Sequence, residues 1–354
     1  MCKIVHLLLI SLFLQSCSSD NDRASLLPDS SGNISEIVIV TDAANRAYYK
    51  NSLDAIFQKP ILGLPSPSEP TFKILYTDQH FFKGYFKNHH HIIVIFSQDH
   101  LDDLATIFDQ SLLAKLSEMF NKNPKLLGIK QVDLYAKNQN IFFVLAENRE
   151  RMLTKIKEMD NQFFETALNH QQMSGYTKLL GTRDYAKDPN FARILKNNNY
   201  ALKIPKTYRI AIENDEFIWL RKVSSTREQQ FGILLFESPF KDTSDLNLSH
   251  LLSVRNRFTK TYIPGEIEGS YMKYSDVIVP TVKKSQYANR PAIDIYGWWN
   301  VSGDYMGGPS HIKVIVDKSR SRLIFAEGFL FYPNENKGES MQELNIILNT
   351  LKIK

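Results

Sequence analysis

The stretch 311-HIKVIVDKSRSRLIFAEGFLFY-332 contains two apolar, β-branched runs separated by a polar hexapeptide. Residues 311–316 and 323–332 are predicted strands, and residues 317–322 are predicted to form the hairpin turn between them. Strands joined by so short a turn run antiparallel. Similar runs occur earlier in this half, at residues 208–212, 217–222, 231–237, 271–279 and 293–299. The second half is therefore expected to be rich in antiparallel strands.

Helices are predicted among these strands and in the first half of the chain. The first half has candidate strands at residues 34–40, 71–77, 91–96, 132–136 and 141–146. Apolar residues at three- and four-residue steps predict helices at residues 45–58, 101–120, 152–180, around 248–254 and at 341–351. Asp42 is the expected N-cap of the first helix. This order predicts an α+β fold, with mixed, largely antiparallel sheets, helices packed on one face, and two lobes.

The predicted domain organisation has four parts. Residues 1–16 form a lipoprotein signal peptide, and residues 17–33 form a lipidated Cys with a flexible polar tether. Residues 34–180 form an N-terminal lobe and residues 200–354 a C-terminal lobe, with residues 181–199 as the hinge. A mature chain of this length exceeds what one hydrophobic core usually holds.

The N-terminal residues have the parts of an export signal. Lys3 is followed by an apolar run at residues 4–14, and Leu14-Gln15-Ser16-Cys17 resembles a bacterial lipobox. The run is about half of the ~20 residues that a membrane-spanning helix needs. The resemblance to a lipobox implies that the thiol of Cys17 receives a diacylglyceryl group, that the chain is cleaved before Cys17, and that the new amine is acylated, for example with palmitate. The alternative is an ordinary secretory signal with a chance Cys.

Charge and cysteine content exclude several classes of function. The formal net charge of the chain, counting Lys3 of the signal, is +5. A positive charge this small and dispersed does not indicate nucleic-acid binding. The chain has two cysteines, Cys2 in the signal and Cys17 at the anchor. The folded part therefore has no thiol, which excludes disulfides, Cys nucleophiles, thiolate zinc sites and iron–sulfur ligation within it. No cofactor is indicated.

Five histidines occur within a short interval of the first half: His80, His89, His90, His91 and His100. Clustered imidazoles can bind zinc or copper. However, the three consecutive histidines directly precede a strand, in which alternate side chains point to opposite faces. At most two of them can converge, so we favour a polar loop over a metal site and name no metal ligand.

The segment from Trp298 to Pro309 contains the candidate ligand contacts. Trp298 and Trp299 are neighbours in a predicted strand, so one faces the core and the other is exposed or covered by the following loop. Gly307 and Gly308 would let a ligand approach the backbone, but we favour a tight turn with a glycine at positive φ. The polar residues near these segments are Arg221, Arg290, Asp304 and Glu327.

Asp304 and Glu327 also allow an enzymatic alternative. A pair of carboxylates can catalyse glycoside hydrolysis when both face one cleft. Separate acids in any chain supply such pairs, and buried acids are commonly structural, so we name no catalytic residue. No Gly-x-Ser-x-Gly elbow of a serine hydrolase occurs.

Several motifs of the second half appear together in a known family. They are 217-FIWLR-221, 262-YIPG-265, 269-GSYM-272, 298-WW-299, 304-DYMGGP-309 and 327-EGF-329 with Pro333. With the loop from Gly63 to Pro70, they make most of the mature chain resemble the uncharacterised lipoproteins grouped as domain of unknown function 4837, from Gram-negative bacteria of the Bacteroidota type. Ser310 and Asn256 depart from the family pattern. The family has no established activity, so the resemblance implies fold and location only.

The sequence thus predicts a lipid-anchored protein of the bacterial cell envelope, at the outer membrane, acting as a non-enzymatic binding or assembly module. Its expected partners are the membrane, through acyl chains on Cys17, and an envelope protein or glycan, with no nucleic acid. The alternative is an envelope hydrolase that uses a carboxylate pair near Trp298 and Asp304.

Overall fold

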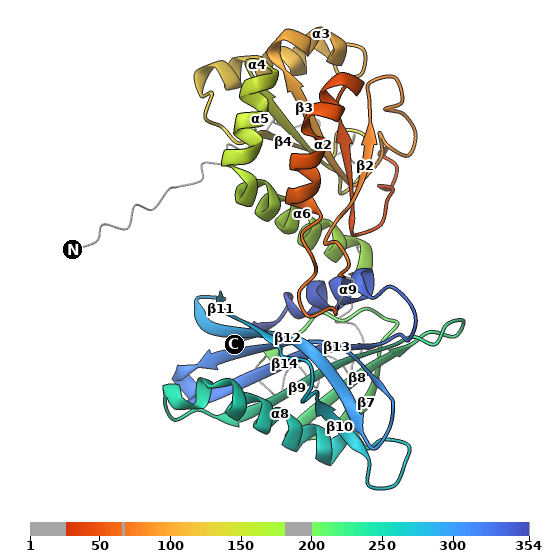
Figure 1. The fold of residues 1–354 in the computed structure, drawn as a ribbon, viewed down its shortest axis with the longest axis vertical. Coiled ribbons are helices and arrows are strands. Elements are labelled where there is room, and N and C mark those ends of the chain that lie inside the picture. Colours follow the sequence, from red (N-terminus) through yellow and green to blue (C-terminus); the bar gives the residue numbers. More distant parts are fainter. Residues whose placement is uncertain (1–25, 66–67, 181–199, 354) are drawn as a thin grey trace, which may run out of the picture.

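The two lobes are stacked along the longest axis of the molecule (Figure 1). The computed structural model describes residues 26–65, 68–180 and 200–353. The strands of the first lobe lie between residues 36 and 146, and those of the large sheet in the second lobe lie between residues 209 and 331. Cys17 and the predicted hinge 181–199 lie outside the described residues, as do residues 18–25 of the predicted tether. No helix among the described residues is both long and apolar enough to cross a membrane.

The N-terminal lobe is built on a mostly parallel sheet in the order β2-β1-β3-β5-β4. Its strands are β1 (Glu36–Val40), β2 (Lys73–Thr77), β3 (His91–Ser97), β4 (Ile129–Val132) and β5 (Asn140–Ala146). β1 pairs in parallel with β2 and β3, and β3 pairs in parallel with β5; only β4 is antiparallel. Every residue of β1, β3 and β5 is buried, as is typical of parallel strands covered on both faces.

Helices cover both faces of this sheet. On one face lie α2 (Ala43–Phe57), α5 (Arg149–Glu158) and α6 (Asp160–Leu180); on the other lie η1 (Gln98–His100), α3 (Leu101–Leu104) and α4 (Gln110–Lys122). Asp42 caps α2 as predicted, because its carboxylate accepts a hydrogen bond of 2.9 Å from the backbone N–H of Asn45. The expectation of helices on one face is wrong for this lobe. Its sheet is mostly parallel, because helical crossovers return the chain parallel to itself, whereas the sheets of the chain taken together are mixed and largely antiparallel, as predicted.

The C-terminal lobe is an antiparallel sheet in the order β10-β12-β13-β14-β9-β8-β7, with β11 also paired to β12. Its strands are β7 (Arg209–Glu213), β8 (Phe217–Val223), β9 (Gln230–Pro239), β10 (Tyr271–Tyr274), β11 (Thr281–Tyr287), β12 (Arg290–Ser302), β13 (Gly307–Asp317) and β14 (Arg322–Phe331). Short elements complete the lobe: β6 (Tyr200–Ala201) paired with β15 (Lys352–Ile353), and the 3₁₀ turns η3 (Thr243–Leu246) and η4 (Lys318–Arg320). Together the lobes confirm the α+β class.

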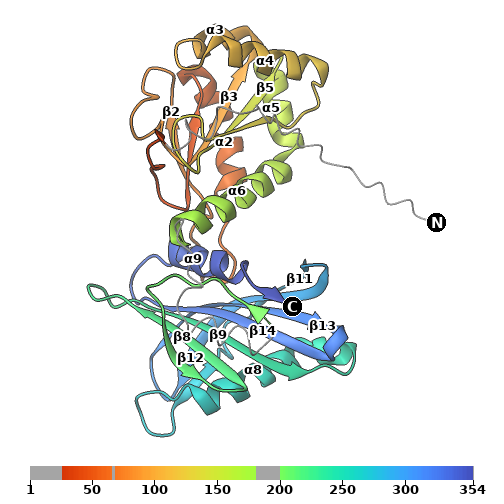
Figure 2. The same ribbon diagram turned by 180° about the vertical axis from the view of Figure 1, so that it is seen from behind.

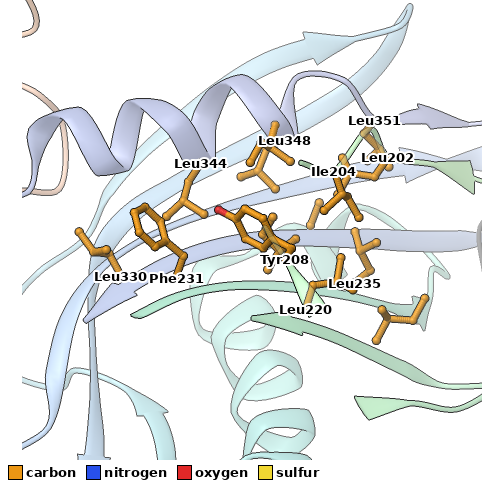
Figure 3. Close-up of a cluster of buried hydrophobic side chains, with 14 of the residues drawn as sticks. Leu202, Ile204, Tyr208, Leu220, Phe231, Leu235, Leu330, Leu344, Leu348 and Leu351 are labelled. Carbon is orange, nitrogen blue, oxygen red and sulfur yellow. The ribbon is translucent and has the colours of Figure 1, made fainter. Parts of the chain in front are cut away.

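One long helix packs on each face of this sheet, so helices are not confined to one face here either. α8 (Leu248–Tyr262) covers one face, and α9 (Gly338–Leu348) covers the other, on the side of the N-terminal lobe (Figures 1 and 2). Figure 3 shows the core beneath α9, where Leu344 and Leu348 pack over Tyr208 and Phe231. All four side chains are buried, so this core fixes α9 to the sheet.

Some observed helices and strands differ from the predicted ones. The predicted helix 101–120 is divided into α3 and α4, and the predicted helix 152–180 is divided at Met159 into α5 and α6. The predicted strand 132–136 is wrong, because β4 ends at Val132. Strand β11 was not predicted, because its sequence, TVKKSQY, is mostly polar.

Candidate functional site

Trp298 and Trp299 lie near the end of β12 and face opposite ways, as predicted. Trp299 is buried against Phe329 at a ring distance of 5.3 Å, and its Nε1–H donates to the Leu330 carbonyl at 3.2 Å. Trp298 is partly exposed and lies across the ladder from Pro309. Trp299 therefore belongs to the core, and Trp298 remains available for contact.

Gly307 and Gly308 are strand residues, so the prediction that one of them adopts positive φ in a tight turn is wrong. The turn lies just before them, and Gly303 has the positive φ of 87°. A Cβ at Gly308 would lie 1.9 Å from the carbonyl oxygen of Leu330. These glycines allow close packing against the neighbouring strands, a requirement that the sequence pattern did not distinguish from a turn.

Glu327 is fully buried, and its carboxylate is hydrogen-bonded to side chains of the same lobe. Arg255 of α8 donates to both of its carboxylate oxygens, Nε to Oε2 at 2.9 Å and Nη2 to Oε1 at 2.8 Å. The hydroxyl of Ser310 donates to Oε1 at 2.7 Å. Glu327 pairs in register with Ile312, roughly 17 Å along β13 from Gly307, and Asp304 lies beyond that strand end. The structure therefore does not bring Glu327 and Asp304 into one cleft.

Arg221 and Arg290 also lie away from the tryptophans. Arg221 is on β8, four strands from β12 in the sheet order, and donates to Gln230 at 2.8 Å. Arg290 begins β12, eight residues before Trp298, which corresponds to about 27 Å of extended strand. Of the candidate residues, the structure gathers only Trp298, Trp299, Asp304, Gly307 and Gly308.

The loops on either side of β10, and the turn between β12 and β13, expose large apolar side chains that sequence reasoning missed. We call Ile267, Val277, Val279 and Tyr305 the β10 corner. Val277 and Val279 are 89% and 87% exposed, Ile267 is 55% exposed, and Tyr305 is fully exposed. The loop with the two valines is fixed beside Trp298, whose carbonyl accepts the Ser275 N–H at 2.8 Å. Trp298 and the two valines therefore lie near each other, and the pairing of Tyr271 with Ser302 places Ile267 near the turn that contains Tyr305.

The three consecutive histidines are buried, so the predicted polar loop is wrong. The rings of His89 and His90 stack with their centres 4.7 Å apart, and the ring centres of His91 and His170 of α6 are 4.4 Å apart. We call these four buried residues the histidine ladder. Burial lowers the pKa of His89 to about 4, of His170 to about 3 and of His90 to about 2, and holds the pKa of His91 well below its usual range. Uncharged imidazoles can pack here where imidazolium ions would not.

The ladder connects the segment before β1 to the lobe. His90 Nε2 lies 2.7 Å from the Asn33 carbonyl, and its Nδ1 lies 3.0 Å from the Ser174 hydroxyl. Among the residues that the structure describes, no group of three or more His, Cys, Asp or Glu residues is placed to hold a metal ion. The ladder is therefore a packing element between β3, α6 and the preceding segment.

A second polar cluster lies on the α9 side of the large sheet. The Asp294 carboxylate accepts from Lys313 Nζ at 2.6 Å and lies 2.8 Å from His311 Nε2. His311 Nδ1 contacts Asn345 of α9 at 2.7 Å, and Tyr296 stacks on its ring at 4.2 Å. Burial alone would raise the pKa of Asp294, but the hydrogen bonds and cationic partner hold it below its usual range. The sequence did contain a signal for this cluster, because His311 and Lys313 are polar residues two apart in an otherwise apolar strand.

Polar contacts also join the two lobes. Glu69, in the proline-rich loop of the N-terminal lobe, accepts hydrogen bonds of 2.7 Å from the backbone N–H groups of Lys337 and Gly338. Gln171 of α6 donates to Gln342 of α9 at 2.8 Å. Figures 1 and 2 show α6 and α9 together at the junction. Helix α9 therefore packs on the sheet below it and on the N-terminal lobe above it.

An open pocket of about 420 Å³ lies at this junction. It is lined by Gln172, Met173, Tyr176, Thr177, Lys203, Asn349, Thr350, Leu351 and Lys352. Leu202 and Ile204 are buried in the core beneath α9 (Figure 3), and Lys203 Nζ lies 4.4 Å from the ring centre of Tyr176. The charged lining residues are both lysines, so the pocket would favour an anion.

The comparisons with known proteins divide the chain in two. Residues 30–178 match the family described as Domain of unknown function (DUF8532), and residues 187–350 match Domain of unknown function (DUF4837). No curated protein matches the chain. The matching solved structures include the crystal structure of LpqN, described as involved in cell envelope biogenesis of Mycobacterium tuberculosis, at 12% identity and a TM-score of 0.28, covering 44% of this chain and 83% of that chain.

The resemblance found in the sequence is confirmed for the second half alone, because the loop from Gly63 to Pro70 falls within the other match. Residues 187–350 of this chain belong to the family Domain of unknown function (DUF4837).

Proposed function

We propose that this chain is a lipid-anchored, non-enzymatic binding module of the bacterial cell envelope, located at the outer membrane and presenting its C-terminal lobe to a protein partner. The export signal and the lipobox ending at Cys17 support the location. At ~0.8 kcal/mol per buried methylene, two or three acyl chains would anchor the protein stably.

The β10 corner is the observation that carries the binding role. Soluble proteins rarely expose several large aliphatic and aromatic side chains in one region of their surface. Where they do, the patch commonly marks an interaction site. Val277 and Val279 are almost fully exposed on one loop, beside the partly exposed Trp298. Covering these side chains with a partner would remove apolar surface from water at about 25 cal/mol per Å².

The placement of the acids favours binding over hydrolysis. Glu327 is ion-paired with Arg255 beneath α8, and Asp304 accepts the backbone N–H of Tyr305 in an exposed turn. A general acid and a base or nucleophile must face one substrate at a defined separation. Neither geometry nor access supports that arrangement for these two residues.

The anchor is tested by Cys17→Ala in the full chain. We expect this variant to lose palmitate labelling and to leave the membrane fraction or remain uncut, with Cys2→Ala as the matched control that changes neither. Unchanged lipid labelling of the Cys17 variant would contradict the proposal.

The binding role is tested by placing a photo-crosslinking amino acid at Val279 in cells. Val223, which is 57% exposed on β8 of the same lobe, is the matched control position. We expect a discrete protein adduct from position 279 that is absent from position 223 and lost on Val277→Ser. Equal crosslinking from both positions would show that the β10 corner has no specific partner.

A further inference from the structure

Strand β11 forms a two-residue hairpin with β12 at the margin of the large sheet (Figure 1). Ala288 and Asn289 join the strands with φ angles of 48° and 61°. Positive φ at both loop residues is the signature of a type I′ turn, whose twist matches that of the strands. The register is therefore fixed, with Tyr287 opposite Arg290.

The register shows which backbone groups of β11 face outward. The pair that flanks a two-residue loop is hydrogen-bonded, and such pairs alternate with non-bonded pairs along an antiparallel ladder. The N–H and C=O groups of Val282, Lys284 and Gln286 therefore point away from β12. Among the described residues β11 pairs with β12 alone, so these groups form a free sheet edge.

The side chains beside this edge are basic. Lys283 and Lys284 are exposed, and neither forms an ion pair with a described residue. The nearest acid in the register, Asp294 opposite Lys283, is already paired with Lys313 and His311. The edge therefore carries two adjacent positive charges, one on each face of the strand.

These charges determine which strand the edge can accept. A second copy of β11 would bring lysines against lysines, and like charges on adjacent strands destabilise pairing. A strand with acidic residues would gain ion pairs on both faces of the sheet. Lysines protect an edge from self-association while leaving it open to an acidic partner.

We propose that the free edge of β11 binds an extended acidic segment of a protein partner by strand addition. The main-chain groups of Val282, Lys284 and Gln286 supply the hydrogen bonds, and Lys283 and Lys284 select the charge. Val277 and Val279 lie in the loop that leads into β11, so the same partner covers them. The inference rests on the proposed binding role and specifies its mode.

The backbone part is tested with the lipidated full chain in detergent and a short fluorescent threonine peptide that contains two adjacent glutamates, so that one carboxylate lies on each face of the added strand. Lys284→Pro removes an outward N–H without touching the ladder to β12, and Lys284→Ala is the matched control for charge. We expect Lys284→Pro to weaken binding at least about tenfold and Lys284→Ala by only a few fold. Equal effects of the two variants would overturn strand addition.

Peptide probes make the same test without altering the protein. Methylating the backbone nitrogens of alternate peptide residues blocks one edge of the added strand and leaves the other intact. We expect one alternate set to abolish binding and the other to preserve it. Loss of binding with both sets, or with neither, would contradict strand addition even if the Lys284→Pro variant failed to fold.

Charge selection has its own measurement. The peptide with lysine in place of glutamate should not bind the wild-type chain, and Lys283→Glu with Lys284→Glu should reverse this preference. The affinity should fall with added salt. A basic peptide that binds as well as the acidic one would overturn the charge assignment. Crosslinking from position 279 that survives this double substitution would retain the proposed binding role and reject β11 as its site.

Discussion

Arg255 of α8 and Glu327 of β14 form a two-point ion pair in which both side chains are fully buried. Two parallel hydrogen bonds of 2.9 Å and 2.8 Å join them, and Ser310 donates to the same carboxylate. The pair links the helix on one face of the large sheet to a central strand. It therefore gives a structural explanation for an acid that the sequence suggested as a ligand contact.

Glu327→Gln should destabilise the chain by about 3–5 kcal/mol, because it leaves the guanidinium of Arg255 buried without its counter-charge. Urea unfolding measures the change. The double variant Arg255→Met with Glu327→Leu should recover much of the loss, since apolar side chains of similar volume replace the whole pair. A Glu327→Gln variant that keeps its stability but no longer binds its partner would instead support a role in ligand contact.

Gly308→Ala should destabilise the chain by several kcal/mol or prevent folding. The new Cβ would lie 1.9 Å from the backbone oxygen of Leu330, which cannot move without breaking the sheet. Gly303→Asn is the matched control, because Gly303 has positive φ with no atom closer than 3.9 Å and Asn tolerates that conformation. Thermal melts of the two variants give the comparison. Equal midpoints would contradict the assignment of Gly308 to a closely packed strand.

Features set by neighbouring residues could be predicted from the sequence. The cap at Asp42 and the hairpin turn before Arg322 depend on a few adjacent residues, and both occur as predicted. The direction of the strands in the first lobe could not be predicted from their apolar runs. Continuous burial is compatible with several sheet arrangements, and it is the helical crossovers that decide between them.

The polar sites could not be predicted from the sequence, because their contacts join residues that are far apart in the chain. Arg255 and Glu327 are 72 residues apart, and His90 and Ser174 are 84 apart. Tertiary packing brings such pairs together, so residue type alone suggested a ligand contact for Glu327 and a polar loop for His90. The free edge of β11 was missed for a different reason. Strands were predicted from apolar patterns, and β11 is mostly polar.

Glu69→Ala should loosen the contact between the two lobes. It removes the acceptor for the N–H groups of Lys337 and Gly338 at the start of α9, at a cost of about 1–3 kcal/mol. Faster amide hydrogen exchange in the first turn of α9 is the expected result. Glu335→Ala, an exposed neighbour, is the control and should leave exchange unchanged. Unaltered exchange in the Glu69 variant would show that the cap does not stabilise the junction.

The free energy of unfolding should fall as the pH drops from 6.5 towards 4.5. In the unfolded chain the ladder histidines bind protons near pH 6.5, whereas burial lowers the pKa of His89 to about 4 and of His170 to about 3. Below pH 6.5 the unfolded state therefore binds more protons, so stability decreases with acid, by up to about 1.4 kcal/mol per pH unit for each histidine.

His91→Phe separates the ladder from other acid-sensitive groups. His91 is buried, its Nδ1 has no hydrogen-bond partner among the described residues, and it packs 6.2 Å from Phe72, so an apolar ring of similar shape should be accepted. The variant has one fewer group to protonate, and the slope of stability against pH between 6.5 and 4.5 should fall by up to one proton. The wild-type chain gives the reference slope. Urea unfolding at several pH values measures both slopes, and identical slopes would mean that the buried ladder does not control acid stability.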